Sequence, residues 1–131
     1  IMDLQINAID PRTGNTAYQS FEVYPGDEHF LKALVAPRIL LETDAASDIW
    51  ANPVGSWQTA MAAKEVYRFL GVEDNLLLVY RPGFHEHQPR DLQTLVNVMK
   101  AKIAGEPLCE DAFRLPFQPT ELIFDWRCPE L

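Results

Sequence analysis

Two polar segments of this 131-residue sequence carry residue types that can do acid–base chemistry. The first contains Asp44 and Asp48, followed by Trp50, and the second contains His85 and His87. A carboxylate that accepts a hydrogen bond from a histidine ring N–H fixes the tautomer of the ring and stabilises its charged form. The pair Asp48 and His85 would then be the acid–base half of a serine hydrolase triad.

Each of these residues also has a less specific interpretation. His85 can be a solvated loop histidine. Asp48 can be a turn or capping residue. Trp50 can be an aromatic side chain of the core or of a lid. The sequence therefore predicts the site from the combination of the three residues, not from any one of them.

A metal site is the weaker interpretation of the two histidines. His85 and His87 are two residues apart, so an extended backbone would place both rings on one side, as metal ligands require. No further Cys or His lies near them in the sequence. Cys109 and Cys128 cannot complete a four-ligand zinc site by themselves, and they can be paired or free. We therefore expect no metal.

Strand and helix patterns alternate through the middle of the chain. Residues 39–43 and 76–80 are short apolar runs, which are typical of buried strands. Each run is followed by a polar loop and then by a helical pattern, at residues 53–70 and 89–104. Uninterrupted apolar strands that alternate with helices indicate an α/β fold with a parallel sheet. The loops beyond the carboxyl ends of such strands hold ligands, and these are the two polar segments described above.

The later of the two helices has one apolar stripe. It consists of Leu92, Leu95, Val96, Met99 and Ile103. Side chains at this spacing form the face that a helix buries.

The two ends of the chain have other patterns. Residues 1–24 alternate around a cluster of turn-forming residues, which predicts an N-terminal β-hairpin. A short helix over residues 27–35 is expected next, capped by Asp27. The proline-rich segment from residue 106 onward is expected to be extended and held by its aromatic side chains, Phe113, Phe117, Phe124 and Trp126. We expect one domain over residues 1–131.

The composition excludes several classes of partner. Apolar residues make up 47% of the chain and charged residues 23%, which is the balance of a soluble globular protein. No apolar run approaches the roughly 18 residues that a membrane span requires, and no signal-peptide pattern is present. The net charge of -8 argues against a nucleic-acid partner, because binding to phosphates needs a basic surface. A neutral or sugar ligand is compatible with this acidic net charge.

The sequence lacks a recognisable nucleophile. The Gly-x-Ser-x-Gly motif of α/β-hydrolases is absent. The serines are Ser20, Ser47 and Ser56, and Gly55-Ser56 lies at the start of a helix and not on a strand–turn–helix. In α/β-hydrolases the triad order is nucleophile, acid and histidine, so the chain supplies the second and third members in order.

Four motifs resemble segments of the bacterial glucuronoyl esterases of carbohydrate esterase family 15. They are DxHxLxALxAPR at residues 27–38, DxWAxPxG at 48–55 running into VYRxLG at 66–71, GxH at 83–85 with PxD at 89–91, and FDWR at 124–127. The resemblance covers residues 25–131 and leaves residues 1–24 uncovered.

The resemblance implies an α/β-hydrolase that cleaves the ester between a glucuronic acid on xylan and a lignin alcohol. His85 would be the triad histidine, Asp48 its acid and Trp50 a sugar contact, without a cofactor. The family's nucleophilic serine, its neighbouring oxyanion-site arginine and an alternative glutamate acid lie upstream of the matching region. The chain is thus similar to the C-terminal half of such an enzyme.

Two functions remain open. The first is the C-terminal segment of a secreted or periplasmic serine esterase that acts on 4-O-methyl-glucuronoyl esters or acetylxylan, inactive without its nucleophile. The alternative is a non-catalytic fragment or pseudoenzyme domain that binds carbohydrate or a partner chain. Half a sheet exposes a strand edge and an apolar face, so we expect a missing N-terminal half or a partner chain to cover them.

Overall fold

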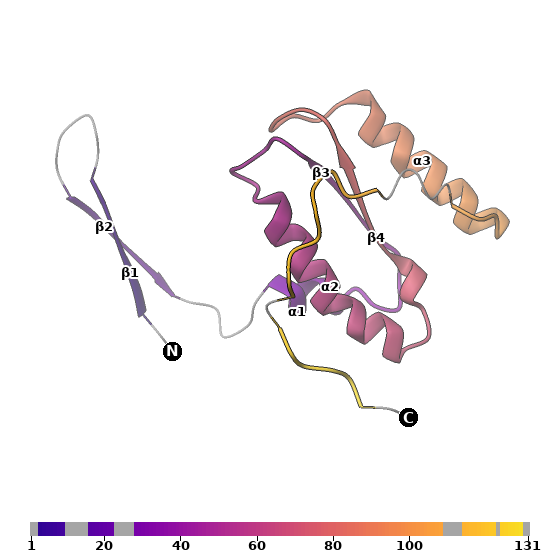
Figure 1. Cartoon of the computed structure of the whole chain (residues 1–131), viewed down its shortest axis with the longest axis horizontal. Coiled ribbons are helices and arrows are strands. Elements are labelled where there is room, and N and C mark those ends of the chain that lie inside the picture. The colour runs from indigo at the N-terminus through magenta and orange to yellow at the C-terminus, as the bar shows by residue number, and fades with distance from the viewer. Residues whose placement is uncertain (1–2, 10–15, 23–27, 109–113, 123, 130–131) are drawn as a thin grey trace.

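The structure is a computed structural model that describes residues 3–9, 16–22, 28–108, 114–122 and 124–129. Its elements in chain order are β1 (Asp3–Ile9), β2 (Thr16–Glu22), α1 (Glu28–Ala33), β3 (Leu40–Ala45), α2 (Pro53–Phe69), a 3-10 turn η1 (Glu73–Asn75), β4 (Leu76–Arg81) and α3 (Pro89–Ala104). Figure 1 shows these elements along the chain.

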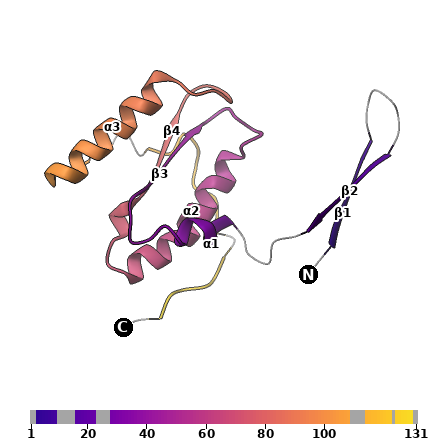
Figure 2. The ribbon, with the colours of Figure 1, turned by 180° about the vertical axis from the view of Figure 1, so that it is seen from behind.

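β3 and β4 form a parallel pair. Their register runs from Leu40 opposite Leu76 to Ala45 opposite Arg81, so both strands end at the same edge. Helix α2 makes the crossover between them, and the strands run between α2 and α3 in both views of the molecule (Figures 1 and 2). The predicted alternation of parallel strands and helices is confirmed.

β1 and β2 form the predicted hairpin. They pair antiparallel from Asp3 opposite Glu22 to Ile9 opposite Thr16. Residues 10–15, where the turn was expected, lie outside the described residues. The hairpin is a separate sheet, since neither of its strands pairs with β3 or β4.

Local capping explains where the two long helices begin and end. The side chain of Asn52 accepts a hydrogen bond of 3.1 Å from the Gly55 N–H at the start of α2. At the start of α3, Gln88 and Asp91 form a capping box. Gly105 ends α3 with a φ of 68°, a left-handed conformation that glycine adopts without strain.

The core lies between α2 and β4. Ala60, Ala63 and Tyr67 of α2 are fully buried and pack with Leu76 of β4. The small alanine side chains let the helix approach the strand closely. A polar contact joins α1 to β3 and α2. The buried Lys32 of α1 donates hydrogen bonds to Glu42 of β3 at 2.9 Å and to Thr59 of α2 at 2.7 Å.

The apolar stripe of α3 is exposed, contrary to the expectation from its spacing. Leu92 is 64% exposed, Met99 52% and Ile103 83%, and the buried residues of the helix are Asp91, Val98 and Ala101. Within the described part of the chain, α3 therefore packs through a different face from its most apolar one.

The C-terminal segment lies against α2 and β4 without forming a helix or strand in its described part. The Gln58 side-chain amide donates hydrogen bonds to Thr120 Oγ1 at 2.6 Å and to the Glu121 carbonyl at 2.7 Å. Phe117 packs edge-on against Tyr80. Cys128 is a free thiol, whereas Cys109, Phe113 and Asp27 lie outside the described residues. None of the described helices is long and apolar enough to cross a membrane.

Candidate active site

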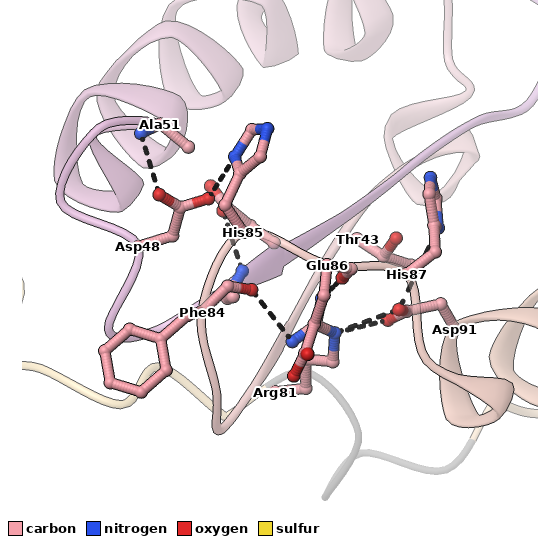
Figure 3. Close-up of a pocket in the computed structure, with 11 residues that line it drawn as sticks. Thr43, Asp48, Ala51, Arg81, Phe84, His85, Glu86, His87 and Asp91 are labelled. Carbon is pink, nitrogen blue, oxygen red and sulfur yellow. Dashed lines mark hydrogen bonds and ion pairs between the residues drawn. The ribbon is translucent and has the colours of Figure 1, made fainter.

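A cavity of about 380 Å³ opens where β3 and β4 end. It is lined by Thr43, Asp44, Ala45, Asp48, Ala51, Arg81, Phe84, His85, Glu86, His87 and Asp91. They come from the ends of β3 and β4, from the loops that follow these strands and, in the case of Asp91, from the first turn of α3 (Figure 3). The cavity therefore lies in the place where parallel α/β sheets bind ligands.

The expected contact between Asp48 and His85 is present. His85 Nδ1 lies 2.7 Å from Asp48 Oδ2 (Figure 3). Asp48 is 5% exposed, whereas the His85 side chain is 83% exposed. An ionised carboxylate can only accept, so Nδ1 donates the hydrogen, and Nε2 of the neutral ring is left as the basic nitrogen. The arrangement can take a proton from a group that approaches Nε2.

The local backbone fixes the Asp48 carboxylate. The Ala51 N–H donates to Oδ1 at 3.3 Å, and the Trp50 N–H also hydrogen-bonds to this carboxylate. Burial by itself raises the pKa of Asp48, but the hydrogen bonds from His85, Ala51 and Trp50 outweigh it. The pKa of Asp48 is therefore held below its ordinary value, and the carboxylate is ionised at neutral pH.

His87 takes no part in this pair. Its Nδ1 lies 4.0 Å from Asp91 Oδ2, and its side chain is 93% exposed. Asp44, the other acid of the first loop, accepts a hydrogen bond from the Ala45 N–H at 2.7 Å. Of the candidate acids and histidines, the structure thus brings together Asp48 and His85. Among the described residues there is no group of three side chains that could hold a metal ion.

Trp50 is an exposed residue of the turn between β3 and α2. It is 93% exposed and does not line the cavity. The structure therefore excludes the core interpretation of Trp50, and its role as a ligand contact stays a prediction.

Ser47 and Ser56 both lie outside the cavity. The backbone N–H of Ser47 donates to the Gly83 carbonyl at 3.2 Å and so joins this residue to the histidine loop, residues 82–88. Ser56 lies in the first turn of α2, and its carbonyl accepts a hydrogen bond from Lys32. Neither residue lines the cavity.

The sequence did not predict the buried ion pair beside the histidine loop. Arg81 Nε lies 2.9 Å from both carboxylate oxygens of Asp91, and both side chains are at least 90% buried. The sequence did contain one signal for such a pair: Arg81 follows the apolar strand run at residues 76–80. A charged side chain that is buried there needs a partner of opposite charge. The partner could not be identified, because it depends on the path of the loop that brings α3 back to the strand.

Comparison with known proteins gives the context of this site. Residues 9–71 match the family model described as "Glucuronyl esterase, fungi", so the similarity begins upstream of the motifs noted at residues 27–38. The chain is 34% identical over 96 residues to carbohydrate esterase MZ0003 from an unknown prokaryotic organism, covering 62% of this chain and 22% of that protein. It is 38% identical over 61 residues to 4-O-methyl-glucuronoyl methylesterase 1 of Phanerochaete chrysosporium, covering 47% of this chain and 13% of that protein.

A solved structure is similar over most of the chain. It is a carbohydrate esterase family 15 glucuronoyl esterase from Caldicellulosiruptor kristjansonii, with a TM-score of 0.72 and 32% sequence identity over 80% of this chain. The chain resembles the C-terminal part of a glucuronoyl esterase. Its fold is accordingly part of an α/β-hydrolase fold. The chain spans 28% of that glucuronoyl esterase and about a fifth of carbohydrate esterase MZ0003.

Proposed function

We propose that this chain supplies the acid and the histidine of a serine esterase that hydrolyses glucuronoyl esters of plant cell walls. The observation that carries the proposal is the 2.7 Å contact between Asp48 and His85 at the carboxyl ends of two adjacent parallel strands. Similarity to glucuronoyl esterases supports the substrate class. Residues 1–131 are in this view one partial domain.

The geometry supports a general-base mechanism. His85 Nε2 takes the proton of a serine hydroxyl as the serine oxygen attacks the ester carbonyl, and then gives that proton to the leaving alcohol. Asp48 stays ionised, holds the ring by Nδ1 and stabilises the imidazolium form. Water then attacks the acyl-enzyme in the same way and regenerates the serine. No step uses a metal or an organic cofactor.

The serine and the donors to the oxyanion come from outside this chain. We place them in the N-terminal part of the same domain, because the exposed apolar face of α3 requires a cover. A plant cell-wall substrate also implies a secreted or periplasmic protein. Without these parts, we expect no hydrolysis by this chain above background.

Trp50 is proposed to contact the sugar. The apolar face of a sugar ring can stack on an exposed indole, and the indole N–H can donate to a hydroxyl. The side chain is 93% exposed and lies two residues after Asp48. Glucuronoyl esters and acetylxylan both offer such a ring.

Kinetics of the complete esterase test the proposal. We expect His85→Gln and Asp48→Asn to lower kcat on a methyl glucuronate ester by at least about 100-fold, the range of general acid–base catalysis. His87→Gln is the matched control, since this histidine lines the same cavity without contacting Asp48, and it should retain activity. Full activity of His85→Gln would contradict the assignment.

A non-catalytic carbohydrate-binding module is the second candidate. The exposed Trp50 and the missing nucleophile motif favour it for a chain that acts alone. Calorimetric titration of the chain with glucuronoxylan fragments distinguishes the two functions. Binding that Trp50→Ala abolishes, combined with an inactive complete protein, would support the module over the esterase.

A further inference from the structure

The position of the His85 side chain depends mainly on the backbone of the histidine loop, residues 82–88. The His85 ring is 83% exposed, so side-chain packing does little to fix it. Its contact with Asp48 is one hydrogen bond of 2.7 Å, and Asp48 is held by a different loop. The geometry of the Asp48–His85 contact therefore depends on the interactions that fix the conformation of the histidine loop.

The Arg81 guanidinium lies inside this loop and contacts its carbonyl groups. Nη1 is 3.4 Å from the carbonyl oxygens of Pro82 and Phe84, and Nη2 donates to the carbonyl of Glu86. Figure 3 shows the contact with Phe84. These carbonyls lie on both sides of His85 in the sequence. The third nitrogen, Nε, lies 2.9 Å from both carboxylate oxygens of Asp91. One planar side chain thus spans the loop from its first residues to the start of α3.

Asp91 fixes the other end of the loop. Its Oδ2 accepts a hydrogen bond of 2.8 Å from the Gln88 N–H, the residue at which the loop becomes helix α3. Asp91 is 7% exposed, and Arg81 is 8% exposed. Because both groups are buried and hydrogen-bonded to each other, the loss of either one would leave the other as a costly unpaired charge.

Gly83 provides the space for this arrangement. It has a φ of 119°, and a Cβ at this position would lie 2.9 Å from Arg81 Nη1. Its carbonyl accepts a hydrogen bond of 3.2 Å from the Ser47 N–H, the residue before Asp48. The loop that Arg81 orders is therefore also joined to the loop that carries Asp48.

We propose that Arg81 and Asp91 are positioning residues that hold the histidine loop in the conformation that presents His85 to Asp48. Arg81 is suited to this role because its planar guanidinium offers five donors in a fixed geometry, which a lysine cannot reproduce. The meaning of this role for catalysis rests on the proposed esterase function. The structural role stands independently of it.

A titration of Asp48 in the full chain tests the proposal. Burial, His85 and two backbone N–H groups are the main influences on the pKa of this carboxyl group, and neither Arg81 nor Asp91 is among them. The side-chain carboxyl carbon of Asp48 can be followed by NMR as a function of pH. His85→Gln is the reference variant, because it removes the contact and so gives the pKa of Asp48 without it.

The expected result is a loss of the downward shift in Arg81→Lys and Asp91→Asn. The pKa of Asp48 should then move toward or above the ordinary aspartate value of about 3.9, as in the reference variant. Arg81→Lys keeps the charge beside Asp91, so it reports on the loop even where Asp91→Asn does not fold. Glu42→Gln is the matched control: it breaks the partly buried ion pair that Glu42 forms with Lys32 at 2.9 Å, and it should leave the pKa of Asp48 unchanged.

An Asp48 pKa equal to that of the wild type in folded Arg81→Lys or Asp91→Asn would overturn the proposal. The titration measures no activity. Failure of the esterase assay would therefore contradict the proposed function without affecting this result.

Discussion

At position 48, burial and hydrogen bonding act on one carboxyl group in opposite directions. Asp48 is 5% exposed, which favours its neutral form, yet it accepts hydrogen bonds from His85, Ala51 and Trp50. The hydrogen bonds lower the pKa of Asp48 by more than burial raises it, so the pKa lies below its ordinary value. The group consequently binds a proton less readily in the folded state than in the unfolded chain.

This difference predicts how stability depends on pH. Because the folded pKa of Asp48 is the lower one, its contribution to stability is complete above the unfolded value of about 3.9 and is lost as pH falls through the folded pKa. Urea unfolding of the wild type and Asp48→Asn should therefore give a difference in unfolding free energy that shrinks between about pH 5 and pH 2. A difference that is constant over this range would show that Asp48 has no depressed pKa.

Tyr67, which is buried, and Tyr80, which is half-buried, offer a pair of substitutions that can be compared. The Tyr80 hydroxyl donates to the Pro53 carbonyl at 2.7 Å, whereas the Tyr67 hydroxyl is buried without a hydrogen-bond partner among the described residues. Tyr80→Phe should lower the unfolding free energy by about 1 kcal/mol, the usual net value of one hydrogen bond. Tyr67→Phe should leave it unchanged or raise it, since it removes an unpaired buried polar group. Equal losses in urea unfolding would contradict this assignment.

The candidate pair Asp48 and His85 was predictable because two parallel strands end at one edge, so the residues that follow them meet. This argument needs only the order of strands and loops. The Arg81–Asp91 pair was not predictable, because ten residues separate its members and their approach depends on the φ of 119° at Gly83. Sequence spacing alone does not specify such a turn.

At the scale of the elements, the start of α2 depends on one residue in an unusual conformation. Asn52 has a φ of 53° and caps the helix through its side chain. Asn52→Ala should cost about 1–2 kcal/mol of unfolding free energy, because it loses the cap and strains the left-handed backbone. Asn52→Gly should cost only a few tenths of a kcal/mol, since glycine adopts this conformation freely. Thermal unfolding of both variants measures the difference, and a larger loss for glycine would exclude this explanation.

Helix ends could be predicted here because their signals are local. Asn52 and Pro53 begin α2, and Pro89 and Gly105 bound α3 in the structure as in the sequence. The residues of α3 do not by themselves predict which face of this helix is buried. The spacing of its apolar residues identifies a face that needs a partner but not where that partner lies.

At the scale of the whole molecule, the parallel sheet of the described residues is small. It contains two strands, β3 and β4, and the residues of β3 from Leu40 to Asp44 are only half-buried. The apolar stripe of α3 lies open as well. The relatives are several times longer than this chain. These observations support the proposal that further strands and helices of the same domain cover both surfaces.

The exposed stripe of α3 gives the last prediction. If the rest of the hydrolase domain packs on it, Leu95→Lys and Met99→Lys should change the unfolding free energy of this chain alone by less than about 0.5 kcal/mol, as exposed positions do. The same changes should destabilise the complete protein by several kcal/mol, because each would bury an unpaired charge. Gln93→Lys, at an exposed polar position of the same helix, is the control and should be neutral in both.

Urea unfolding of the two forms checks this comparison, and light scattering adds a second measurement. An open apolar stripe promotes association of the isolated chain, so the two lysine variants should also be less associated than the wild type, whereas Gln93→Lys should not. If Leu95→Lys and Met99→Lys leave the complete protein as stable as the control does, α3 faces solvent there. The cover proposed for this chain would then have to lie on the free edges of β3 and β4, where added strands pair through backbone hydrogen bonds and need no apolar helix face.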